Sequence, residues 1–286
     1  MKQYFIGIMV MLMCIACEKP LITGNQEEDI PEGNLMIKVF EIEKTPFGSL
    51  TRATEEASAV CKHLNYAVYS TTGERLKQVN QTTGTSGFGT ASFQLDEGKY
   101  LVVVVGHSSN GNPTMTDPTC IKFTNAQGFT DTFVFCDEVT VDEDQVELKV
   151  SLNRIVSMCR FVLTDDIPEG IKKMRFYYTG GSGAFDATTS LGCVNSKQDV
   201  KIDITSSAQK QFDLYTFLHD KEGIIHLSVS ALDVNGNELY AREFDVPMEQ
   251  NHITWLSGAF FNGVSTTTVT GVTVNTTWEG EHHITF

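Results

Sequence analysis

A succession of short strand-like segments, with no amphipathic helix between them, is what most constrains the fold of this chain. The segments are rich in Val, Ile, Thr, Tyr and Phe, and turn residues separate them. They cover residues 35–42, 63–70, 90–95, 99–107, 133–139, 146–152, 155–163, 173–178, 201–205, 224–234, 238–246, 252–261 and 271–278. Because strands joined without helical crossovers usually pair with antiparallel neighbours, the sequence predicts an all-β protein built from antiparallel β-sandwiches.

One of these segments makes the sharpest local prediction. Ile225, Leu227 and Val229 alternate with polar residues, which is the period of a strand with one buried face. Asn235 and Gly236 follow, and this pair favours the tight turn of a β-hairpin. The sequence therefore predicts a hairpin that turns at these two residues.

The number of strands indicates two domains. It exceeds that of one ordinary sandwich, and the acidic stretch 137–145 precedes a second set of strands. We place the boundary near Val150, which predicts an N-terminal β-sandwich at residues 34–150 and a C-terminal β-sandwich at residues 151–286.

The first residues have the pattern of a lipoprotein signal. Lys2 is positive, residues 4–16 carry no charge, and this run is shorter than the about 20 apolar residues of a membrane span. A small residue directly precedes Cys17, so residues 1–16 resemble the signal peptide and lipobox of bacterial lipoproteins; an ordinary signal peptide cut nearby is the alternative. A lipid on Cys17 would anchor the chain in a membrane. The polar residues 17–33 are expected to form a tether.

The remaining cysteines form no metal motif. Their spacings contain no C-x-x-C and no Cys/His cluster. An exported protein meets an oxidising compartment, but an odd number of thiols cannot all pair. We expect most of them to be buried free thiols, and the sequence leaves their disulfide state open for Cys61, Cys120, Cys136, Cys159 and Cys193.

Charge and motifs exclude several functions. The formal charge of −15 disfavours nucleic acid as a partner, since an acidic surface repels phosphates. The sequence has no H-E-x-x-H motif, phosphate-binding loop or nucleophile elbow. No catalytic residue, metal or cofactor is therefore predicted, and the chain is expected not to be an enzyme. The glycines of GGSG at residues 180–183 are expected to form a flexible loop, and residues 233–238 a hairpin turn rather than a calcium loop.

The polar and aromatic residues near the end of the chain have two interpretations each. Glu281, His282 and His283 could bind a metal, but adjacent residues of a strand point to opposite faces, so a solvated terminus is expected. Trp255 and Trp278 could form a platform on which sugars stack. Their apolar neighbours favour a place in the core.

Several longer stretches resemble a known family, the Bacteroidales fimbrillin superfamily, and within it the lipoprotein subunits that act as anchors or accessory components. The stretches are GKYLVVVVGHSSNGNPTMTDP, LNRIVSMCRFVLTDDIPEGIKKMRFYYTGGSGAFD, NHITWLSGAFF and VNTTWEG, in this order. The resemblance implies two tandem transthyretin-like β-sandwich domains, lipoprotein export, and a role in fimbria assembly and cell adhesion. The implied partners are other fimbrial subunits, the outer membrane through the N-terminal lipid, and host or bacterial surface ligands.

The resemblance also implies polymerisation by exchange of strands. A sandwich that lacks one strand exposes an unpaired edge and an apolar groove, which a segment of a neighbouring subunit can fill. In fimbrillin shaft subunits a trypsin-like protease cuts after an Arg that follows the first strand. Here the first strand would present Leu35, Ile37 and Val39, and the next loop contains Arg52 as its candidate cleavage site. An intact Arg52 would give a lipid-held anchor or accessory subunit, and a cut would give a shaft or tip subunit that has lost Cys17.

The last strand-like segment is a candidate donor or closing strand. Val272, Val274 and Trp278 lie at alternate positions, which suits entry into a groove. The alternative is an ordinary terminal strand that pairs within its own domain.

A function of another class remains open from the sequence. An outer-membrane lipoprotein that binds glycans for polysaccharide capture would have two or three exposed aromatic side chains on one face. A subunit that assembles would instead have apolar residues beside an open sheet edge. Both functions place the protein at the cell outer membrane, held by its lipid.

Overall fold

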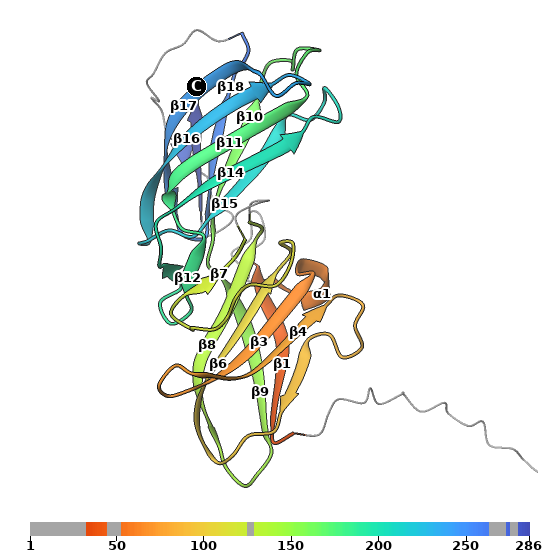
Figure 1. The fold of residues 1–286 in the computed structure, drawn as a ribbon, viewed down its shortest axis with the longest axis vertical. Helices are drawn as coiled ribbons and strands as arrows, with labels where there is room; N and C mark the ends of the chain where they lie inside the picture. The colour runs from red at the N-terminus through yellow and green to blue at the C-terminus, as the bar shows by residue number, and fades with distance from the viewer. Residues whose placement is uncertain (1–32, 45–52, 125–128, 263–272, 275–279) are drawn as a thin grey trace, which may run out of the picture.

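A computed structural model describes residues 33–44, 53–124, 129–262, 273–274 and 280–286. Two β-sandwiches lie end to end along the long axis of the molecule (Figure 1). The prediction of an all-β fold is confirmed. Among the described residues the one α-helix is α1, a single turn at Ala57–Val60. No helix in this part of the chain is long and apolar enough to cross a membrane.

The N-terminal sandwich is one sheet folded onto itself. Its strand order is β2-β1-β9-β8-β6-β3-β4, and β5 also pairs with β1. β8 and β9 pair near Phe133 and Arg154, so the sheet turns at this corner and its two halves enclose a core. The strands are β1 (Leu35–Lys44), β2 (Ala53–Glu55), β3 (His63–Ser70), β4 (Arg75–Thr82), β5 (Thr90–Phe93), β6 (Gly98–His107), β8 (Thr132–Val141) and β9 (Val146–Arg154).

The C-terminal sandwich consists of two sheets around a second core. One has the strand order β15-β10-β18-β20-β19 and the other β14-β11-β16-β17. β9 runs across Val150, and Ile155 and Val156 connect it to the first strand of the second sandwich. The strands are β10 (Ser157–Leu163), β11 (Lys173–Gly181), β14 (Ser196–Asp203), β15 (Gln211–Thr216), β16 (Glu222–Leu232), β17 (Glu238–Glu249), β18 (His252–Gly258), β19 (Thr273–Val274) and β20 (Gly280–Thr285).

Three strand pairs correct the prediction of purely antiparallel sheets. β1 pairs in parallel with β9, β10 with β18, and β18 with β20. A parallel pair needs a long connection between its strands. Here much of each sandwich lies between β1 and β9 and between β10 and β18, so the first strand of each sandwich closes against a strand from its end.

The predicted hairpin is confirmed. β16 and β17 pair antiparallel and turn at residues 233–237, where Gly236 has a φ of 83°. The Asp233 carboxylate accepts hydrogen bonds from the backbone N–H groups of Asn235 and Asn237, both 2.8 Å. Hydrogen bonds from Asn237 lower the pKa of Asp233. The carboxylate is thus engaged within the turn, as expected for a hairpin and not for a calcium loop.

The glycines of GGSG are not in a flexible loop, which corrects that expectation. Gly180 and Gly181 end β11, and Ser182 is fully buried. Gly180 has a φ of 91°, and a Cβ atom on it would lie 2.3 Å from the Ile224 carbonyl oxygen. Glycine is required here because the backbone of β16, the neighbouring strand in the same sheet, approaches this closely.

A third core joins the two sandwiches and explains the apolar run in β6. Val102 and Val104 face the N-terminal core, whereas Val103 and Val105 face this third core. Both faces of β6 are therefore buried, and the sequence alternates less than that of a half-exposed strand. Across the third core, the ring centroids of Phe129 and Phe217 lie 5.5 Å apart.

Backbone pairing also links the sandwiches. A three-stranded sheet contains β7 (Ile121–Lys122), from the connection between β6 and β8, and β12 (Ala184–Asp186) and β13 (Leu191–Gly192), from the connection between β11 and β14. β7 pairs antiparallel with β12. One strand from the first half of the chain and two from the second thus make one sheet at the junction (Figure 1).

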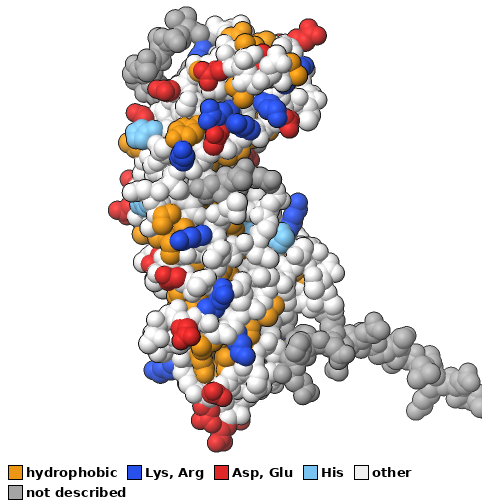
Figure 2. All heavy atoms as spheres, viewed as in Figure 1, with side chains coloured by type: hydrophobic (Ala, Val, Ile, Leu, Met, Phe, Trp, Pro, Cys, Tyr) orange, Lys and Arg blue, Asp and Glu red, His pale blue; other side chains and the backbone are white. Residues whose placement is uncertain are grey.

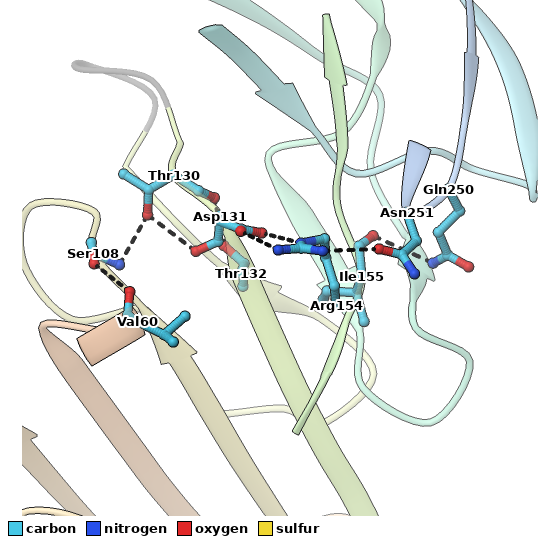
Figure 3. A network of polar contacts seen from close by, with 9 residues as sticks. All are labelled: Val60, Ser108, Thr130, Asp131, Thr132, Arg154, Ile155, Gln250 and Asn251. Carbon is cyan, nitrogen blue, oxygen red and sulfur yellow. Dashed lines mark hydrogen bonds and ion pairs between the residues drawn. The ribbon is translucent and has the colours of Figure 1, made fainter. Parts of the chain in front are cut away.

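A buried ion pair lies at the same junction (Figure 3). The Arg154 guanidinium donates from Nε and Nη2 to the two carboxylate oxygens of Asp131, at 2.7 Å each. Arg154 Nη1 also donates to Asn251 Oδ1 (3.4 Å), and Gln250 donates to the Ile155 carbonyl oxygen (3.3 Å). The network connects β8 and β9 of one sandwich with the turn between β17 and β18 of the other.

Candidate strand-exchange sites

β1 is an interior strand of the N-terminal sandwich. It pairs in parallel with β9 from Leu35 to Ile42, and antiparallel with β5 and then β2 on its other side. Both rows of backbone hydrogen-bonding groups are therefore used. Removing β1 would leave an edge on β9 and another on β5.

The side chains of β1 fill the N-terminal core. Leu35, Ile37 and Ile42 have no exposed surface, and Val39 is half-buried and packs against the same core. The pairing with β9 shifts by one residue between Val39 and Glu41. This bulge explains why Ile42 faces the core, a role that strict alternation from Leu35 does not predict.

Polar contacts of Asn34 hold the start of β1 in place. Asn34 Nδ2 donates to the Leu95 carbonyl oxygen (2.8 Å), and the Leu95 N–H donates back to Asn34 Oδ1 (2.9 Å). The Val146 N–H donates to the Asn34 carbonyl oxygen (2.8 Å). Asn34 thus ties the start of β1 to the chain on both sides of it.

The end of β1 leads to the candidate cleavage site. Lys44 pairs with Ala53, so residues 45–52 connect two antiparallel neighbours. Arg52, which directly precedes Ala53, lies outside the described residues, as does Cys17. A cut after Arg52 would separate β1 from β2 in the covalent chain and leave the pairing of β1 intact.

Acidic residues surround the start of β1. The β8–β9 turn carries Asp142, Glu143 and Asp144, and the β5–β6 turn carries Asp96 and Glu97, all exposed. Pairing of Gly98 with Val141 places the two turns side by side. Figure 2 shows acidic side chains at this tip of the molecule. The tip is therefore the most negative part of the N-terminal sandwich in this view.

β20 belongs to the C-terminal sandwich, which corrects the expected solvated terminus. The Glu281 side chain is 8% exposed, and Ile284 is buried. The Phe286 ring stacks on Phe161 at 5.3 Å and contacts Phe244 at 4.7 Å between centroids. His282 approaches Glu249, whereas His283 stacks on Trp255, so the two histidines point to opposite faces as predicted.

The other candidate donor residues are only partly described. Val274 belongs to β19, which pairs antiparallel with β20 through His282. Its side chain, Val272 and Trp278 lie outside the described residues. The described strands β19 and β20 pair within their own domain.

We expect Gly258→Ala to displace the end of β20. A Cβ atom at Gly258 would lie 2.1 Å from the Phe286 carbonyl oxygen and 2.6 Å from its ring. Phe286 must then leave its place among the aromatic rings, so we expect a loss of about 2 kcal/mol in the free energy of unfolding. Urea denaturation followed by tryptophan fluorescence measures it.

Gly223→Ala is the matched control. A Cβ atom at Gly223, in β16 of the same domain, would have its nearest contact at 3.5 Å. We expect a change within about 0.5 kcal/mol. If both variants lose the same stability, the place of Phe286 against Gly258 is not what makes the first one unstable.

Trp255 offers no free ring face to a sugar. The Arg160 guanidinium lies over the ring at 4.8 Å, and the His283 ring stacks on it at 5.4 Å from the strand on the other side. The hydrogen bond to Asp213 raises the pKa of Arg160, which keeps it charged. Among the described Phe, Tyr and Trp residues, Tyr240 is the one with an exposed side chain.

Apolar side chains lie instead beside an open sheet edge. β17 is the terminal strand of its sheet, and its first half is exposed on both faces. Leu239 is 50% exposed and Tyr240 38% exposed on this strand, and Val234 in the preceding turn is 77% exposed. We call Val234, Leu239 and Tyr240 the β17 patch.

No described part of the chain contains three metal-ligating side chains in one group. Cys61 and Cys159 are buried, Cys136 is half-buried, and Cys120 and Cys193 lie near the surface. Burial raises the pKa of the Cys159 thiol to about 12, which keeps it protonated and unreactive.

Comparison with known proteins gives a family and a set of similar folds. Residues 32–286 match the model of a family of unknown function, DUF6562. No curated protein matches the sequence.

Solved structures with a similar fold include proteins of Bacteroides and Porphyromonas. A candidate polysaccharide-binding protein (DUF1812) of Bacteroides thetaiotaomicron is 12% identical, with a TM-score of 0.46 over 73% of this chain and 80% of that one. A candidate cell adhesion protein of Bacteroides ovatus is 12% identical, with a TM-score of 0.48 over 81% and 94%. The fimbrial anchor protein Mfa2 of Porphyromonas gingivalis is 12% identical, with a TM-score of 0.42 over 73% and 80%. A fimbrial anchor protein and a candidate cell adhesion protein are thus among the matching structures.

Proposed function

Because this chain belongs to the DUF6562 family, whose function is unknown, and its sequence resembles the fimbrillins, we propose that it is a non-enzymatic fimbrial subunit acting in fimbria assembly and cell adhesion. Its partners are other fimbrial subunits, and β-strand complementation joins them. A lipid on Cys17 holds the chain in the outer membrane, and residues 17–33 form the tether to the first sandwich.

The observation that carries this proposal is the position of β1. It is interior to its sheet, its three innermost side chains are fully buried, and residues 45–52 alone separate it from β2. Exchange of a strand in this position would open a groove and two sheet edges at once. The same geometry serves a subunit that keeps β1 and one that loses it.

We assign the anchor or accessory role, in which β1 is retained. Asn34 and the pairing on both sides hold the strand in place. Retention also keeps Cys17 in the same covalent chain as both sandwiches. The β17 patch lies on a strand that is terminal in its sheet among the strands that the structure describes, and it supports contact with a further subunit.

The test is the N-terminus and Arg52 in protein isolated from its native envelope. We expect a mature chain that begins at acylated Cys17 with the Arg52–Ala53 bond intact, and we expect other fimbrial subunits to be captured with it from the detergent-solubilised envelope. Intact mass and peptide mapping measure the first, and mass spectrometry of the captured fraction the second. Arg52→Ala is the control, and it should behave as the wild type.

Two other outcomes would change the assignment. A chain that begins at Ala53, and an Arg52→Ala variant that is excluded from fimbriae, would make this a shaft or tip subunit activated by proteolysis. A chain with a lipid on Cys17 that binds polysaccharide and is never found with fimbrial subunits would contradict the proposal and favour glycan capture.

A further inference from the structure

Two thiols from different halves of the chain lie in contact at the junction between the sandwiches. Cys193 Sγ donates to Cys120 Sγ at 3.2 Å. Cys120 directly precedes β7, in the connection between β6 and β8, and Cys193 directly follows β13, in the connection between β11 and β14. The contact therefore joins a segment of the first sandwich to a segment of the second.

The backbone on both sides of these thiols is held by hydrogen bonds. The Cys120 N–H donates to the Asp117 carbonyl oxygen (3.1 Å), and the Cys193 N–H donates to the Ala184 carbonyl oxygen (3.2 Å). The Ala187 N–H donates to the Pro118 carbonyl oxygen (2.9 Å), which connects the two segments directly. The two sulfurs are thus kept close by the small interdomain sheet.

The surroundings make this pair the reactive one. Cys193 is exposed and Cys120 half-buried, so an oxidant can reach them, whereas Cys61 and Cys159 are buried. A disulfide needs sulfurs about 2.05 Å apart, so the present contact must shorten by little more than 1 Å. Side-chain rotation at an exposed position can supply such a movement.

We propose that Cys120 and Cys193 form a disulfide that staples the two sandwiches together in the mature protein. This rests on the export that the proposed function includes, because an oxidising compartment is where such bonds persist. The bond would close a loop that spans the third core and the three-stranded sheet. It would hold the junction in addition to the Arg154–Asp131 ion pair.

The oxidant is a protein disulfide of the thiol oxidase class. One cysteine of the pair, as thiolate, attacks that disulfide and forms a mixed disulfide. The second, as thiolate, attacks the mixed disulfide, so that the Cys120–Cys193 bond forms and the oxidase leaves as a dithiol. The two electrons and the two thiol protons pass to the oxidase.

The first test is thiol trapping in protein from its native envelope. The sample is quenched in acid, unfolded, alkylated with N-ethylmaleimide without reductant, and digested. We expect a cross-linked peptide pair that contains Cys120 and Cys193, and alkylated Cys136 in the same sample as control. Alkylation of both Cys120 and Cys193 in chains that carry a lipid on Cys17 would overturn the disulfide and leave export standing.

The second test does not depend on export. The purified, reduced chain is incubated with oxidised glutathione, and its mass and thermal unfolding midpoint are measured. We expect an internal disulfide, lower in mass by two hydrogen atoms, and a midpoint higher by on the order of 5 °C than in the reduced chain. Cys136→Ser should keep both effects, and Cys193→Ser should lose both and carry glutathione on Cys120. If the wild type carries only glutathione adducts, the proposal is wrong.

Discussion

A chain that begins at Ala53, and so lacks β1, is expected to lose the cooperative unfolding of its N-terminal sandwich. The loss removes Leu35, Ile37 and Ile42 from the core, each of which contributes about 2 to 3 kcal/mol by burial. It also removes the pairing with β9 and β5. The sum is comparable to the whole stability of a domain, about 5 to 15 kcal/mol.

A peptide of residues 33–44 added in trans should restore the transition. It carries Asn34, the three buried side chains and the backbone of β1, which are the groups that the groove and both edges bind. Near-ultraviolet circular dichroism is the measurement, because Tyr66 is buried in the core of this sandwich. Urea titration with and without the peptide then gives the stabilisation.

The same peptide with Ile37→Asp is the control. It places a carboxylate where the structure has a fully buried side chain, so it should not bind. Lys38→Ala, at a half-exposed position beside it, should bind as the wild type does. A truncated chain that unfolds as the full chain does, or one that the peptide leaves unchanged, would contradict strand complementation at β1.

Arg154→Met is expected to cost about 3 kcal/mol in the free energy of unfolding. The Arg154 side chain is 4% exposed and that of Asp131 25% exposed, so the variant leaves a largely buried carboxylate without its cation. Arg154 also lies over the Phe133 ring at 5.0 Å. Because the network reaches Asn251, we expect the loss to reach the second sandwich.

Urea denaturation followed by tryptophan fluorescence measures the effect in the second sandwich, because Trp255 and Trp278 both follow residue 156. Arg175→Met is the matched control, since Arg175 makes the same two-bond contact with Asp199 but is 36% exposed. We expect at most about 1 kcal/mol there. Asp131→Leu combined with Arg154→Met should recover part of the loss. Equal losses at Arg154 and Arg175 would show that the junction does not depend on this ion pair.

Strands rich in apolar residues were predictable from the sequence, and strands that are mostly polar were not. β3 and β16 agree with their predicted segments to within two residues. β4 has apolar residues at too few positions, because it is an edge strand that is largely exposed. β15 was not among the predicted strands, although its buried Phe212 and Leu214 lie at alternate positions.

The direction of strand pairing and the junction could not be predicted. Alternation says which face of a strand is buried, but nothing of whether its neighbour runs parallel. β20 is polar apart from Ile284. Phe286, which follows β20, packs against Gly258, a residue that is remote in sequence. Arg154 and Asp131 have no motif between them, and only the folded chain shows that they meet.

The candidate site in β1 was predictable in part, because alternation shows which side chains of a strand are buried but does not show a bulge. Leu35 and Ile37 follow the alternating pattern and lie in the core, whereas the bulge after Val39 brings in Ile42. A bulge leaves no mark in this pattern. Asn34 could have been suspected as a polar residue at the start of an apolar strand, but its partner at Leu95 is a backbone group.

The parallel pairing of β1 with β9 determines how the molecule responds to tension. A pull on the chain before Gly33 acts along β1, and it loads the hydrogen bonds to β9 and β5 in shear, so that many must break together. A hairpin pulled open from its end would break its bonds one after another. β1 is therefore a mechanical clamp: even in a chain severed after Arg52, the segment before Gly33 would stay attached to the sandwich until another strand displaced β1 from one end.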